Sequence, residues 1–113
     1  MLKIDGKELV LNQNKGFIGD LKYEQTFNRS LTDDLMQIIK DGVNVKFDRL
    51  GFFRICFLMS GYIDNITFDD FLSKIHPKYN FLEDFIDVLE KAQSSYLPIE
   101  SPKEESEKQP ETK

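Results

Sequence analysis

The sequence predicts an α+β domain that is predominantly helical, with an N-terminal β-hairpin packed on four to five helices around one apolar central helix at about residues 45–60. Three observations predict this class. Apolar and polar residues alternate around Asp5-Gly6 near the start, which is typical of a hairpin. Later segments place apolar residues at helical spacing. One of these segments is apolar on nearly every side, so other elements must surround it.

The N-terminal region predicts two strands, near residues 2–5 and 8–12, and then a short helix. Two strands alone are only marginally stable, so we expect the apolar edge of the hairpin to lie on the helices. Gly16 and Gly19 weaken the helix that follows. The apolar residues that define these elements are Leu2, Ile4, Leu9 and Leu11 in the hairpin, and Phe17, Ile18, Leu21 and, at the edge of the pattern, Phe27 in the helix.

A second helix is predicted to begin at Thr32 and to end near Gly42, because Asp33 and Asp34 favour a helix N-terminus and glycine favours a C-terminus. Asn44 is the predicted cap of the central helix, which would run to about Ser60. A membrane span would need about 20 apolar residues, and two arginines interrupt this segment. We therefore expect a buried helix and no membrane partner.

Two more helices are predicted after the central one. Thr67 and Asp70 have the spacing of a capping box, and His76-Pro77 closes the brief helix that they open. Asn80 with Glu83 repeats the cap pattern at the start of a last helix. The wide apolar face of that last helix contains Phe81, Leu82, Phe85, Ile86, Leu89 and Ala92.

The C-terminal composition changes to Pro-rich, charged sequence without aromatic residues. Such a segment buries too little apolar area to offset its ordering entropy. We expect one domain at residues 1–96 and a disordered tail at 97–113. Ten Phe and four Tyr are more aromatic bulk than a domain of this size easily hides, so some rings are expected at an interface, with a Phe-rich core as the equal alternative.

The charge and residue types bound the function. A formal net charge of −5 and the lack of a basic run disfavour nucleic acid as a partner, and with it a small helix-turn-helix regulator. Cys56 lies among apolar residues and His76 precedes a proline, so a catalytic Cys-His pair is not expected. The acidic stretch at 64–70 lacks the glycine and closing glutamate of a calcium loop. We predict no catalytic, metal or cofactor site.

The residues proposed to contact a partner lie on the central and last helices. Arg54 is surrounded by apolar residues on its helix, so it needs either a carboxylate from another helix or a role in binding a client. The ion pair is the favoured alternative. The candidate partner-binding residues are Phe52, Phe53, Arg54, Phe57, Phe81 and Phe85, and the Phe residues among them are equally consistent with a core.

In its layout the chain resembles the tail assembly chaperones of long-tailed bacteriophages of Gram-positive hosts. The resemblance covers about residues 1–95 and rests on the hairpin LKIDGKE at 2–8, KGFIGDL at 15–21, the apolar middle helix, TFDDFL at 67–72 and FLEDFIDVLEK at 81–91. The chain departs from the family in the many Phe residues of its middle helix.

The resemblance implies a non-catalytic, oligomeric protein of the infected host cytoplasm that coats and solubilises the tape measure protein and is absent from the mature virion. In this family a longer, frameshifted product often recruits the tail tube protein, and the C-terminal tail is where such an extension would join. The alternative from another class is a structural virion protein of the head-tail connector or tail completion type.

Overall fold

The computed structural model describes residues 2–11 and 16–96, and it confirms the predicted mostly helical fold with an N-terminal hairpin. The predicted tail at 97–113 lies outside the described residues. The strands are β1 (Lys3–Ile4) and β2 (Lys7–Glu8), and the helices are α1 (Gly16–Phe27), α2 (Leu31–Val43), α3 (Arg49–Met59), α4 (Phe68–Ser73) and α5 (Phe85–Tyr96). Two 3₁₀ turns, η1 (Tyr62–Asp64) and η2 (Phe81–Glu83), precede α4 and α5.

The hairpin is antiparallel, with Lys3 opposite Glu8 and Ile4 opposite Lys7. Asp5 and Gly6 both have positive φ angles, 53° and 81°, as a tight two-residue turn requires. Each strand is shorter than predicted, although one more backbone hydrogen bond, from the Leu9 N–H to the Leu2 carbonyl at 2.8 Å, extends the hairpin. The alternating residues Leu2, Ile4, Leu9 and Leu11 are nevertheless buried, so the hairpin packs its apolar edge into the core as expected.

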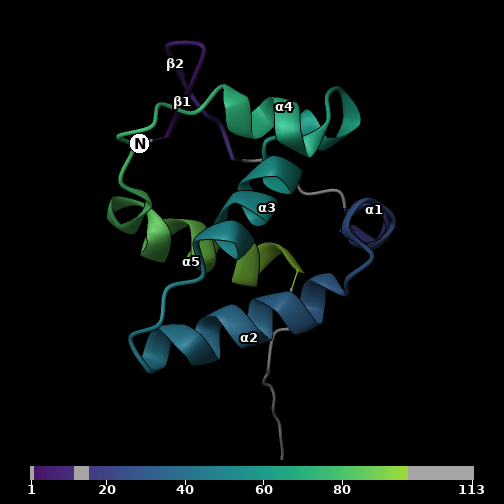
Figure 1. The fold of residues 1–113 in the computed structure, drawn as a ribbon. Coiled ribbons are helices and arrows are strands. Elements are labelled where there is room, and N and C mark those ends of the chain that lie inside the picture. Colours follow the sequence, from purple (N-terminus) through teal and green to yellow (C-terminus); the bar gives the residue numbers. More distant parts are fainter. Residues whose placement is uncertain (1, 12–15, 97–113) are drawn as a thin grey trace, which may run out of the picture.

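The central helix is confirmed as α3, which lies in the middle of the fold (Figure 1). It packs against α5, α4, η1 and α2, and every residue from Phe52 to Met59 except Phe53 is buried. Its predicted start was wrong. The N-cap is Asp48, whose carboxylate accepts a hydrogen bond from the Gly51 N–H at 2.9 Å, and Asn44 instead closes α2. Val45 has a φ of 60°, which a helix cannot contain.

Two other predicted boundaries were also wrong. Ser30 rather than Thr32 caps α2, with its hydroxyl accepting a hydrogen bond from the Asp33 N–H at 3.2 Å. Asn80 opens only the short turn η2, and α5 begins after it at Phe85. The Thr67 cap is confirmed, because its hydroxyl accepts from the Asp70 N–H at 3.1 Å. Ser, Thr, Asn and Asp all cap well, so the choice between neighbouring candidates depends on tertiary packing.

Two groups of aromatic rings pack on α3, one against α4 and the other against α5. The Phe57 ring lies 5.1 Å from the Phe71 ring and 5.4 Å from the Phe68 ring, and the Phe52 ring lies 6.2 Å from the Phe85 ring. These centroid separations are typical of favourable aromatic pairs. Across residues 2–11 and 16–96, no helix is long and apolar enough to cross a membrane.

Candidate partner-binding surfaces and a buried polar cluster

The aromatic residues predicted to contact a partner come together in the structure, but mostly as core. Phe52, Phe57 and Phe85 are buried, so their rings do not reach the surface. Phe53 and Phe81 are half-buried and pack against the Phe52 ring at 5.3 and 5.5 Å. The Phe-rich core therefore describes Phe52, Phe57 and Phe85, whereas Phe53 and Phe81 keep part of their surface exposed.

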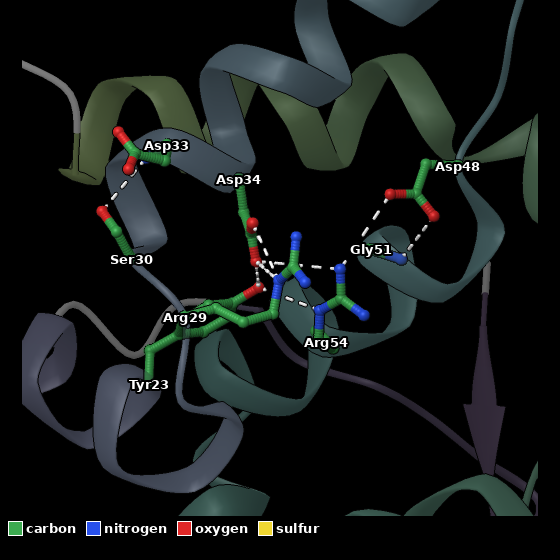
Figure 2. Close-up of polar contacts among 8 residues, drawn as sticks. All are labelled: Tyr23, Arg29, Ser30, Asp33, Asp34, Asp48, Gly51 and Arg54. Carbon is green, nitrogen blue, oxygen red and sulfur yellow. Dashed lines mark hydrogen bonds and ion pairs between the residues drawn. The ribbon is translucent and has the colours of Figure 1, made fainter.

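Arg54 is only 8% exposed and makes the ion pair that was the favoured expectation. Its Nε donates to the Tyr23 hydroxyl at 3.1 Å, and its Nη2 lies 3.7 Å from an Asp34 oxygen and 4.0 Å from an Asp48 oxygen (Figure 2). The guanidinium also stands 5.9 Å from the centre of the Phe27 ring. Arg54 therefore connects α3 to both α1 and α2.

Asp34 is the centre of this polar cluster, and it is 5% exposed. It accepts hydrogen bonds from the Tyr23 hydroxyl at 2.6 Å and from Arg29 Nε at 2.8 and 3.0 Å (Figure 2). Burial raises the pKa of this carboxyl, but the hydrogen bonds from Arg29 and Tyr23 outweigh it and leave the pKa below its ordinary value. Asp34 thus stays ionised and contacts the Tyr23 hydroxyl and the guanidinium groups of Arg29 and Arg54.

The same contacts raise the pKa of Tyr23, first through burial and then through its hydrogen bond to Asp34. The hydroxyl therefore keeps its proton and remains a donor. The buried residues of α1 are Tyr23 and the small Gly19. The polar cluster of Tyr23, Asp34 and Arg54 is consequently a principal anchor of α1 on the rest of the fold.

Most apolar residues of α1 face outward instead of into the core. Phe17 is 74% exposed, Ile18 62% and Leu21 41%, and their spacing places them along one side of the helix. We call these three residues the α1 face. The helix itself lies at the edge of the molecule (Figure 1). Scattered exposed apolar residues are ordinary, but three on one short helical face make this face a candidate contact surface.

A second group of exposed apolar residues surrounds the junction of α2 and α3 and the start of α5. The Phe47 ring lies 5.2 Å from the Phe85 ring, and a side chain placed on Gly42 would meet Phe85 as well. The junction and the start of α5 are therefore adjacent. We call this group the Phe47 surface, and its exposed members are Val43, Val45, Phe47, Leu50, Leu82 and Ile86.

Neither surface was identified from the sequence, and the reason differs. The sequence predicts that residues 45–47 belong to the buried central helix, because the second half of that segment is apolar on nearly every side. The sequence predicts only that Phe17, Ile18 and Leu21 share the helical spacing of the first helix. Helical spacing defines a face but does not say whether the core or solvent meets it.

The two other residues considered for catalysis are Cys56 and His76. Cys56 is buried, and burial raises the pKa of its thiol, so it is not a reactive thiolate. His76 is exposed and its Nδ1 accepts from the Lys78 N–H at 3.0 Å. Among the residues that the structure describes, no three His, Cys, Asp or Glu side chains are grouped so that they could hold a metal ion.

Comparisons of this chain with protein-family models, with curated proteins and with solved structures gave no match.

Proposed function

We propose that this chain is a non-catalytic assembly chaperone that binds an apolar helical client through the α1 face. The proposal rests on the observation that Phe17, Ile18 and Leu21 are exposed together on one side of α1. Apolar helices of a client pack along such a face in the way that amphipathic helices pack in pairs. Binding of this kind needs exposed apolar surface and no reactive group.

The resemblance to tail assembly chaperones supplies the identity of the client in this proposal. The segment KGFIGDL at 15–21, on which the resemblance partly rests, contains all three residues of the α1 face. The client is then the tape measure protein of a long-tailed phage, which the chaperone keeps soluble in the host cytoplasm. A longer product of the same gene would recruit the tail tube subunits.

The polar cluster supports this assignment because it gives the α1 face a fixed position. Tyr23 on α1 is joined to Asp34 on α2 and Arg54 on α3 by hydrogen bonds of 2.6 and 3.1 Å. The face therefore belongs to an anchored helix, so little ordering entropy is lost when a client binds. An apolar surface on a fixed helix is suited to repeated contacts along a long helical client.

The test is co-expression of the chain with a fragment of a phage tape measure protein that is insoluble alone. We expect the wild type to keep the fragment soluble and to co-purify with it. The triple variant Phe17→Gln, Ile18→Gln, Leu21→Gln should lose both effects while it remains folded, because glutamine is a good helix former and these side chains are exposed.

The matched control is Val10→Gln, which replaces an exposed apolar residue outside both surfaces. It should retain the fragment as the wild type does. Equal retention by the triple variant would contradict the α1 face as the client site. Detection of the chain in purified virions by mass spectrometry would favour the structural virion protein over the chaperone.

A further inference from the structure

Two small cavities meet at the segment that joins α4 to η2. The first, of about 190 Å³, is lined by residues of α3, α4 and this segment, among them Arg49, Phe53, Leu72, Ile75, His76 and Tyr79. The second, of about 210 Å³, is lined by Leu2, Lys3, His76, Lys78 and Tyr79. Pockets for small molecules begin at about 300 Å³, so each cavity has room for a side chain rather than for a whole ligand of that kind.

The first cavity has an apolar floor. Phe53, Leu72 and Ile75 are half-buried, and the Phe53 ring lies 6.1 Å from the Tyr79 ring. Phe53 is also the one residue between positions 52 and 59 of α3 that keeps part of its surface exposed. An apolar side chain inserted beside Phe53 would therefore leave water on several sides, as the anchor residue of an interface does.

Positive side chains stand around both cavities. Arg49 lines the first, Lys3 and Lys78 line the second, and all three are exposed. None of the three forms an ion pair with another residue in the described ranges. His76 lines both cavities, and its Nδ1 accepts a hydrogen bond from the Lys78 N–H at 3.0 Å. Its Nε2 is therefore the ring nitrogen that can donate to a ligand.

The acidic neighbours of this region leave its positive charge in excess. Asp5 forms an ion pair at 3.2 Å with the lysine that caps α4, and the Asp48 carboxylate caps α3. Asp84 is buried and accepts a hydrogen bond from the Tyr79 hydroxyl. Glu83, which precedes Asp84, is exposed and is the remaining negative charge among these neighbours. A chain with a formal net charge of −5 thus has a locally cationic surface here.

We propose that these two cavities bind an acidic peptide segment of a partner protein. One apolar side chain of the peptide enters the cavity beside Phe53, and its carboxylates pair with Arg49, Lys3 and Lys78. Guanidinium and ammonium groups around an apolar pocket are complementary to such a peptide in both charge and shape. Single-stranded nucleic acid fits less well, because bases stack on exposed ring faces and the Phe53 ring is half-buried.

This site is separate from the α1 face and does not depend on the client proposed for it. The carrying cations come from three distant parts of the sequence, so the lack of a basic run does not exclude them. An apolar helical client would leave these charges unpaired. The acidic peptide is therefore a second partner class, recognised by charge together with one anchor residue.

The first experiment measures binding of a labelled peptide with one phenylalanine between glutamates to the full chain by fluorescence anisotropy. Arg49→Gln with Lys78→Gln should weaken binding by about tenfold or more, because two carboxylate partners are lost. The matched control is Lys40→Gln with Lys91→Gln, which removes two exposed cations that line neither cavity. It should bind as the wild type does, and circular dichroism checks that both variants fold. Absence of binding to the wild type, or unchanged binding by folded Arg49→Gln with Lys78→Gln, would overturn the proposal.

The second experiment varies the ligand on the wild-type chain. A peptide with serine in place of the phenylalanine should bind more weakly, because the cavity beside Phe53 stays empty. A peptide with lysines in place of the glutamates should not bind. Single-stranded oligothymidylate should displace the acidic peptide poorly. Equal binding of the serine peptide, binding of the lysine peptide, or tighter binding of the oligonucleotide would each contradict an acidic peptide site.

Discussion

Helices α3 and α1 contain similar apolar residues, yet α3 is buried and α1 presents them to solvent. In α3, residues 55–59 are all buried, because α5, α4 and α2 pack around it. In α1, Gly19 and Tyr23 are buried, whereas Phe17, Ile18 and Leu21 are exposed. Helix α3 is held by apolar packing on several sides, whereas α1 is held by the hydrogen-bonded Tyr23 together with the half-buried Phe27, whose ring lies 5.0 Å from the Phe68 ring.

The sharpest test of this difference removes one ring from each helix. Phe57→Ala should cost about 3–5 kcal/mol in free energy of unfolding, because the Phe57 ring is buried against Phe68 and Phe71 and a cavity would replace it. Phe17→Ala should change it by about 0.5 kcal/mol or less, as exposed substitutions usually do. Chemical denaturation of both variants measures the two costs. Similar costs would show that the two helices are not held differently.

A second test breaks the polar anchor between the helices. Asp34→Ala should cost about 3 kcal/mol, because it leaves the buried Arg54 without its closest carboxylate and the Tyr23 hydroxyl without its acceptor. Asp33→Ala is the matched control, since Asp33 is the exposed neighbour in the same turn of α2 and should cost about 1 kcal/mol or less. Denaturation curves of Asp34→Ala and Asp33→Ala measure the two changes in unfolding free energy. Indistinguishable costs would count against a stabilising cluster.

A finer test removes only the hydroxyl that joins α1 to this cluster. Tyr23→Phe keeps the buried ring but leaves Asp34 and Arg54 short of one hydrogen bond, at an expected cost of about 1–2 kcal/mol. Amide hydrogen exchange should accelerate more in α1 than in α3, because α1 depends on this contact. Tyr62→Phe, on a half-buried residue of η1, is the control. Uniform acceleration in both helices would argue against a specific anchor.

The pH dependence of stability gives the smallest expected effect. The folded-state pKa of Asp34 is lowered, so its contribution is fully present above its unfolded pKa of about 4. That contribution is lost as the pH falls from about 4 through the lower folded-state value. The difference in unfolding free energy between wild type and Asp34→Ala should therefore shrink in this acid range. A difference that stays constant below pH 4 would mean that the cluster does not depend on the Asp34 charge.

The central helix and the hairpin could be predicted because their signals are local and strong. A run such as Phe52 to Met59 has no polar side that water could cover, and Asp5-Gly6 supplies the positive φ angles of a turn. The Arg54 ion pair was also foreseeable, since a buried guanidinium needs a carboxylate. Its particular partners, Asp34 and Tyr23, come from helices distant in sequence and required the structure.

The sequence by itself determined the order of the elements, the buried central helix and the need for a buried ion pair. Only the tertiary structure decided which apolar residues stay outside. Helical spacing makes Phe17 and Phe57 equally suited to burial. Phe57 is buried because α4 and α5 pack around α3, whereas Phe17 lies on an exposed side of α1. Val45 is the clearest case, since a left-handed backbone at a valine follows from the junction between two helices and from no local preference.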